Sequence, residues 1–157
     1  MDPRDLLKSA RDLVNVANGK PRQANLLRAT STTYYALFHT LARTCADLLI
    51  GGASSARSKP AWRQVYRALE HRHAKSICQN GTKISKFPQE IQDFANMFAS
   101  MQEKRHQSDY DPQVKAYKSA VLNDINGVEA AIADFERAPL KDRRAFAAYV
   151  LFKTRSN

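Results

Sequence analysis

The chain has 157 residues, which fits one domain, and 43% of them are hydrophobic, which is enough to bury one core. This composition excludes a disordered basic tail, and no apolar stretch reaches the ~18 uncharged residues that a spanning helix needs. The first residues carry Asp2 and Asp5 and lack the apolar segment of a secretory signal. We therefore expect a cytoplasmic protein without a membrane contact, in which Cys45 and Cys78 are free and buried.

The positive charge is concentrated in two stretches. Lys and Arg number 25 against 15 Asp and Glu, which gives a net charge of +10. Residues 57–75 and residues 137–157 each hold six basic residues and one acidic residue, so these two stretches account for the whole excess. A basic element beside a neutral body is typical of proteins that bind nucleic acid. The alternative is a solvated face that only keeps the protein soluble.

The six prolines predict where helices begin, because proline suits the first helical turn. Reading forward from each proline predicts helices over 3–18, 21–50, 60–79, 88–110 and 112–137, and a shorter one over 142–153. Asp2-Pro3 and Asp111-Pro112 add an N-cap carboxylate before the proline. No segment alternates with the period of a strand. The predicted fold is all-α: an up-and-down bundle of four to five helices over residues 1–137, followed by a short basic helical extension over 138–157.

The apolar stripe of the helix over 88–110 stops at an arginine. Phe94, Phe98 and Met101 recur at helical spacing, and the next position on that face is Arg105. An arginine that points into a bundle is costly unless it is paired. Asp109, four residues later, is the simplest partner, and Tyr110 would then pack over the pair. The alternatives are a symmetry-related copy of the chain and a ligand phosphate.

Residues 104–112 place a guanidinium, an imidazole, a carboxylate and a phenol at one helix end. Arginine can hold a phosphate with two hydrogen bonds, and histidine exchanges a proton near neutral pH. Both properties are needed for metal-independent RNA cleavage, in which a 2′-hydroxyl attacks its own phosphate. The candidate catalytic residues are Arg105, His106, Asp109 and Tyr110.

Two further helix faces carry polar side chains that could contact RNA, although each could also be an ordinary solvated or partly buried face. We expect no metal site, because the two histidines of His71-x-His73 point to different sides of a helix, and we expect no cofactor. The candidate RNA-binding residues are Arg28, Tyr35 and His39 on the helix over 21–50, and Arg63, Arg67 and His71 on the helix over 60–79.

Two short motifs stand out in the sequence. Residues 28–39 read RATSTTYYALFH, and residues 105–112, at the end of a long helix, read RHQSDYDP. Together they resemble the motifs of the HEPN family of bacterial helical proteins. The resemblance covers residues 1–135. It implies an all-α bundle that forms a homodimer and works with a nucleotidyltransferase-like antitoxin or within an antiphage defence system. Active members of the family are metal-independent ribonucleases whose motif is Arg, a polar residue, a few variable residues and then His.

This chain departs from the family motif at its last position. Arg105 and His106 match its beginning, but positions 110–112, where the closing histidine would fall, are Tyr, Asp and Pro. The stretch 67–73 fits the formula literally but lies in a different helix. Two readings remain: a ribonuclease toxin in which His106 supplies the acid–base function, or a non-catalytic protein that binds RNA, nucleotide or a partner through Arg105, Asp109 and Tyr110. A third reading is a structural adaptor, for which the basic surface would be dispensable.

Overall fold

The computed structural model describes residues 1–16 and 19–156 and confirms the all-α fold. Within these residues it has eight helices and no strand. The helices are α1 (Pro3–Val14), α2 (Gln23–Ile50), α3 (Lys59–Ala68), α4 (His71–Cys78), α5 (Gly81–Ile84), α6 (Gln89–Tyr110), α7 (Lys118–Glu136) and α8 (Leu140–Leu151).

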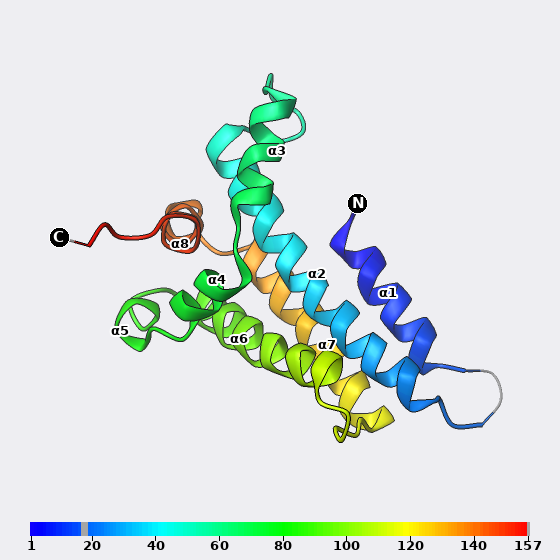
Figure 1. The fold of residues 1–157 in the computed structure, drawn as a ribbon. Helices are drawn as coiled ribbons and strands as arrows, with labels where there is room; N and C mark the ends of the chain where they lie inside the picture. Colours follow the sequence, from blue (N-terminus) through cyan, green and yellow to red (C-terminus); the bar gives the residue numbers. More distant parts are fainter. Residues whose placement is uncertain (17–18, 157) are drawn as a thin grey trace.

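Four long helices, α1, α2, α6 and α7, lie side by side and form the bundle, with successive members antiparallel (Figure 1). The three shorter helices α3, α4 and α5 connect α2 to α6, and α3 projects away from the bundle beside the end of α2 (Figure 1). The last helix, α8, packs on α2 and α4. Among the described residues, none of the helices combines the length and the apolarity that a membrane crossing requires.

The core is one cluster of apolar side chains that includes the C-terminal helix. Phe94 of α6 stacks on Phe135 of α7 with ring centroids 4.2 Å apart, and Phe146 of α8 meets both rings edge-on. All three are fully buried. The basic extension expected after residue 137 is therefore packed into the core of the bundle. Cys45 and Cys78 are free and buried, as predicted, and burial raises the pKa of each thiol to about 12.

The single helix predicted over 60–79 is wrong, because the chain is extended at Leu69 and Glu70 and forms α3 and α4 instead. Continuing the helix would turn His73 towards the core. The two extended residues let α4 start in a new orientation, in which Ala74, Ile77 and Cys78 are buried. Burial of apolar surface therefore overrides the continuous helical pattern here.

The helix predicted to start at Pro112 starts at Lys118. The carboxylate of Asp111 does accept a hydrogen bond from the backbone N–H of Gln113, at 2.9 Å, but this contact forms a turn rather than a helix cap. The side chain of Gln23 then holds the following segment: it donates to the carbonyl of Ala116 at 2.8 Å and accepts from the Ala116 N–H at 2.9 Å. These two long-range hydrogen bonds give the backbone N–H and the carbonyl of Ala116 the partners that they would have had in a helix.

The other helix boundaries lie close to their predicted positions. Helix α2 begins at Gln23 and α6 at Gln89, and α8 covers Leu140–Leu151 because Pro139 is its N-cap. Helix α1 ends at Val14, earlier than the predicted residue 18, and residues 17–18 of that prediction lie outside the described residues.

Candidate functional site

Arg105 lies in the interior position that its spacing predicted. Its side chain is only 14% exposed and follows the fully buried Met101 by one turn of α6. The guanidinium carbon lies 5.3 Å from the ring centroid of Tyr34 and 5.8 Å from that of Tyr35, both on α2. The two aromatic faces stabilise the cation where water is largely excluded. The structure thus brings the polar face of α2 to the end of α6.

The hydrogen bonds of Arg105 are incomplete. The predicted pair with Asp109 is present, but at 3.4 Å, and the other carboxylate oxygen of Asp109 accepts a 2.7 Å hydrogen bond from Ser31. The buried Nε of Arg105 has no partner among the described residues, and neither has the buried Oε1 of Gln102 one turn earlier. Buried polar groups are nearly always hydrogen-bonded, and a guanidinium has five donors to satisfy. Arg105 therefore keeps donor capacity for a further acceptor.

Two histidines are each held by a tyrosine from another helix: His71, which feels the charge of Arg105, and His39. The hydroxyl of Tyr34 shares a hydrogen bond of 2.5 Å with Nδ1 of His71, and the hydroxyl of Tyr66 shares one with Nδ1 of His39. His71 also stacks on Phe38 with ring centroids 4.0 Å apart. With Nδ1 engaged, Nε2 of each ring is the nitrogen that remains for a ligand, as proton acceptor or donor according to the tautomer.

The electrostatics keep both imidazoles neutral at pH 7. Burial lowers the pKa of His71 below its ordinary value, and the positive charge of Arg105 lowers it further. Burial likewise lowers the pKa of His39 and raises the pKa of the tyrosine hydroxyls of Tyr34 and Tyr66. The site thus combines a fixed cation with neutral imidazoles, which is an arrangement suited to proton transfer next to an anion.

We call these side chains the Arg105 cluster. Its members come from α2, α3, α4 and α6, and two candidate RNA-binding histidines are among them. The Arg105 cluster consists of Ser31, Tyr34, Tyr35, His39, Tyr66, His71, Arg105 and Asp109.

The other predicted site residues lie outside the Arg105 cluster. His106 and Tyr110 are exposed and contact each other, with ring centroids 4.8 Å apart. Tyr110 was predicted to pack over the pair of Arg105 and Asp109, and this is wrong: its side chain is 69% exposed, because it points to the solvent side of the last turn of α6. The remaining predicted residues, Arg28, Arg63 and Arg67, are exposed.

Sequence reasoning missed three members of the Arg105 cluster. Tyr34, Tyr66 and Ser31 recur at helical spacing with apolar residues, and this spacing is typical of a core position rather than of a polar site. Tyr34 is indeed fully buried, yet its hydroxyl reaches His71. The signal that could have found them is chemical: a tyrosine or serine in a core stripe needs a polar partner.

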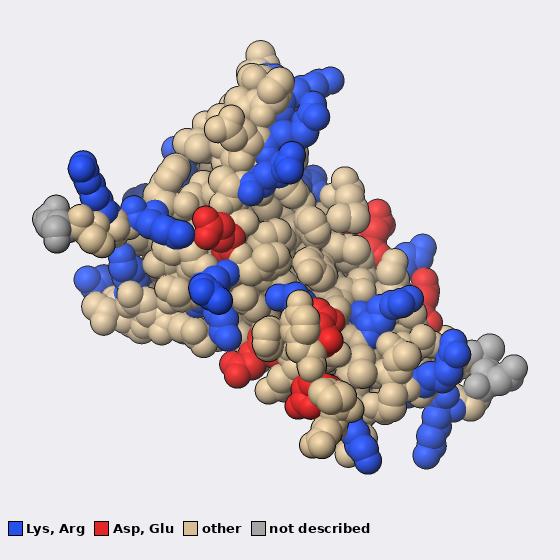
Figure 2. Space-filling view, viewed as in Figure 1, with Lys and Arg blue, Asp and Glu red and all other residues tan. Residues whose placement is uncertain are grey.

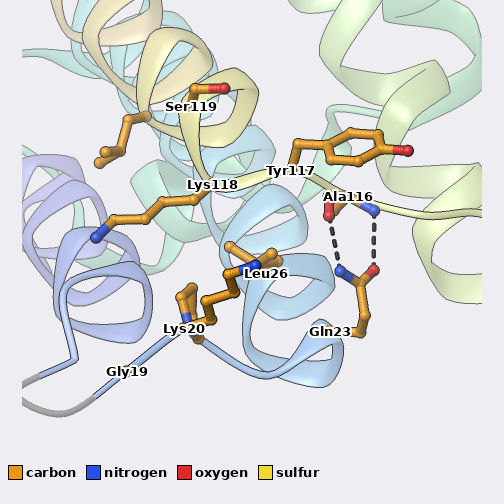
Figure 3. A pocket seen from close by; sticks show the side chains of 10 residues that line it. Gly19, Lys20, Gln23, Leu26, Ala116, Tyr117, Lys118 and Ser119 are labelled. Atoms are coloured by element: carbon orange, nitrogen blue, oxygen red, sulfur yellow. Dashed lines mark hydrogen bonds between the residues drawn. The ribbon is translucent and has the colours of Figure 1, made fainter.

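A cavity of about 710 Å³ opens elsewhere, between the beginnings of α2 and α7 (Figure 3). Lys20, Leu26 and Lys118 line it, and the paired hydrogen bonds between Gln23 and Ala116 border it (Figure 3). No residue of the Arg105 cluster lines this cavity. Within residues 1–16 and 19–156, no group of three or more histidines, cysteines or carboxylates is arranged to hold a metal ion.

Comparison with models of protein families, with curated proteins and with solved structures gives no match for this chain.

Proposed function

We propose that this protein binds RNA and cleaves it without a metal ion, as a ribonuclease of the HEPN type, and that the Arg105 cluster is its active site. One observation carries the proposal: a nearly buried guanidinium with an unpartnered Nε stands beside a neutral histidine whose Nδ1 is fixed. A protein selected for stability alone gains nothing from this combination.

Arg105 binds the phosphodiester in this proposal. A phosphate oxygen would accept hydrogen bonds from the guanidinium through its exposed part, and the two tyrosine rings hold the side chain in place before the ligand arrives. Asp109, itself tied to Ser31, limits how far the guanidinium can turn. The cation then stabilises the negative charge that grows on the phosphate oxygens in the transition state.

His71 exchanges the proton. Its Nε2 accepts the proton of the RNA 2′-hydroxyl while that oxygen bonds to phosphorus. The bond between phosphorus and the 5′ oxygen breaks, a 2′,3′-cyclic phosphate forms, and the leaving 5′ oxygen takes a proton from water. The lowered pKa of His71 keeps its ring in the basic form at neutral pH. His71 thus supplies the function that the sequence had suggested for His106.

The basic surface guides RNA to this site. The exposed side chains of Arg63 and Arg67 lie on α3, whose Tyr66 belongs to the Arg105 cluster. Figure 2 shows lysine and arginine gathered along the projection of α3 and around the neighbouring elements. Such charge attracts the phosphate backbone and releases its counterions. The resemblance to the HEPN family further favours a cytoplasmic homodimer that works in a toxin–antitoxin or antiphage defence system.

The test is to incubate the purified chain with total RNA and tRNA in the presence of a chelator. We expect products that end in 2′,3′-cyclic phosphate, and no cleavage of DNA. His71→Asn, which keeps a polar group near Nδ1, and Arg105→Ala should each reduce the rate about 100-fold or more. The matched control, Arg72→Ala, changes the exposed neighbour of His71 and should cleave normally. Cleavage that survives both site variants would overturn the proposal.

The second candidate function is a non-catalytic adaptor that binds RNA or nucleotide and acts with a nucleotidyltransferase-type partner. The observation that favours it is the exposed pair of His106 and Tyr110 at the position where the family motif closes. In that case RNA binds with the same dependence on Arg105 but stays intact, and His71→Asn leaves binding unchanged.

A further inference from the structure

A small polar cavity of about 240 Å³ lies where the first turns of α1 and α8 and the end of α7 meet α2. Figure 1 shows that α1 begins beside α2. Seven of the nine residues that line the cavity are charged or are threonines, so the cavity suits a polar ligand. Its volume is below the roughly 300 Å³ at which pockets for drug-sized ligands begin, so that ligand is small.

The two carboxylates of this cavity are each paired through one oxygen. Oε2 of Glu136 accepts a hydrogen bond from Arg4 at 2.8 Å. Oδ1 of Asp47 accepts one from Arg57 at 3.0 Å and one from the indole N–H of Trp62 at 2.8 Å. The other oxygen of each carboxylate has no partner among the described residues. Each carboxylate is thus neutralised by an arginine and keeps an acceptor for a hydroxyl group.

Two further arginines line the cavity without a carboxylate of their own. Within the described part of the chain, neither Arg43 nor Arg143 takes part in an ion pair. Nε of the half-buried Arg143 donates to the carbonyl of Ala138 at 2.9 Å, which fixes the guanidinium and leaves its terminal nitrogens as donors. Two uncompensated guanidinium groups that come from different helices and line one polar cavity are suited to hold a phosphate group.

We propose that this cavity binds a small phosphate ester that carries hydroxyl groups, such as a sugar phosphate. Arg43 and Arg143 donate to the phosphate oxygens. The remaining oxygens of Asp47 and Glu136 accept hydrogen bonds from the hydroxyl groups of the ligand. An RNA strand fits poorly, because its neighbouring phosphates would lie against these two carboxylates.

This inference goes beyond the proposed cleavage and does not depend on it, since no residue that lines the cavity belongs to the Arg105 cluster. Trp62 provides a signal from the cavity: it is the only tryptophan of the chain, and its indole N–H donates to Asp47.

The experiment is a titration of the full chain with ribose 5-phosphate at constant ionic strength. Calorimetry gives the affinity, and tryptophan fluorescence shows whether the ligand binds beside Trp62. We expect saturable binding that changes the fluorescence. Inorganic phosphate, which lacks the hydroxyl-bearing sugar, should bind at least threefold more weakly, and ribose, which lacks the charge, should bind more weakly still.

Two site variants and a matched control test the arginines. Arg43→Gln and Arg143→Gln should each weaken the binding of ribose 5-phosphate about tenfold or more, because a charged hydrogen bond to phosphate is lost. Arg144→Gln removes the exposed neighbouring cation, which does not line the cavity, and should leave the affinity unchanged. Circular dichroism checks the fold. If Arg143→Gln does not fold, Arg43→Gln decides the test, because it breaks no ion pair of the described residues.

The proposal is overturned if neither calorimetry nor fluorescence shows saturable binding, or if inorganic phosphate binds as tightly as ribose 5-phosphate. It is also overturned if Arg43→Gln and Arg144→Gln weaken binding equally. An RNA oligonucleotide without a terminal phosphate that displaces ribose 5-phosphate, and binds more weakly to Arg43→Gln, would assign the cavity to the RNA backbone instead. A chain that binds ribose 5-phosphate as expected but cleaves no RNA would contradict only the proposed function.

Discussion

Arg105 is the residue whose nearly buried position is least explained by a contribution to stability. It occupies the position where the stripe of Phe94, Phe98 and Met101 continues, and only a 3.4 Å pair with Asp109 balances its charge within the described residues. Removing a guanidinium from water costs several kcal/mol, of which the faces of the two tyrosine rings offset a part. Retaining a charge at such a position points to a ligand.

Replacing the charge by an apolar side chain should therefore separate stability from function. Arg105→Met keeps most of the volume, and we expect the free energy of unfolding to stay equal or to rise by about 1–3 kcal/mol. RNA affinity should fall at least tenfold, because the charged hydrogen bonds to phosphate are lost. Thermal unfolding and a binding titration measure the two effects. A destabilised variant with unchanged RNA affinity would make Arg105 a structural residue.

The two partly buried histidines, His39 and His71, predict how stability depends on pH. Burial lowers the pKa of His71 and of His39 in the folded chain, so below pH ~6.5 the unfolded chain binds more protons. Their contribution to stability is complete above that pH and is lost as the pH falls towards the lowered values. We expect the urea midpoint to drop between pH 7.5 and 5.5, and His71→Asn to make the drop smaller. The exposed control, His106→Asn, should leave it unchanged; equal drops in all three proteins would contradict the assignment.

At the scale of helices, sequence patterns predicted most of the helix boundaries that depend on local residues alone. The bounds of α2 and α6 follow from proline and from apolar periodicity. The two errors have long-range causes. The break at Leu69 depends on which residues the rest of the bundle can bury, and the extended chain before α7 depends on Gln23, far away in the sequence.

The same limit applies to the candidate site. The spacing of apolar residues predicted that Arg105 lies in the interior and that it pairs with Asp109, and the structure confirms both the position and the pair. It could not show that His71 lies near enough to Arg105 to feel its charge, because that arrangement depends on the break before α4 and on the packing of α4 against α6.

The contact between Gln23 and Ala116 can be tested directly. Gln23→Ala removes both hydrogen bonds to the segment before α7, and each is worth about 1 kcal/mol. We expect the Ala116 amide hydrogen to exchange roughly five to ten times faster, while the interior of α6 is unaffected. Gln23→Glu keeps the acceptor for that amide and should protect it in part. Unchanged exchange in the alanine variant would show that other contacts hold this segment.

At the scale of the molecule, the two basic stretches that are separate in sequence come together. The stretch 57–75 forms α3 and most of α4, the stretch 137–157 contains α8, and α4 packs on α8. There His73 Nε2 lies 3.0 Å from the carbonyl of Tyr149. Figure 2 shows lysine and arginine along the projection of α3 and near the C-terminus, and also at the opposite end of the bundle, where acidic side chains lie among them. The net positive excess therefore falls in the two stretches, although single cations occur elsewhere.

RNA affinity should accordingly fall steeply with salt. Each phosphate contact adds about 0.7 to the slope of log affinity against log salt concentration for a single strand. Arg63→Gln with Arg67→Gln should lower that slope by about 1 or more. Arg4→Gln, which removes a cation paired with Glu136 at 2.8 Å on the neutral body, is the control and should leave the slope unchanged. An RNA affinity that does not change with salt concentration would contradict a phosphate-binding surface.

The central claim is that Arg105 and His71 act together on one phosphodiester, and a double-mutant cycle of cleavage rates tests it most directly. Residues that act as a unit are not additive. We predict that Arg105→Ala with His71→Asn is no slower, within about threefold, than the slower of the two single variants. Losses that multiply would show that the two residues act independently, and a His71→Asn variant as active as the unchanged protein would remove the histidine from the chemistry.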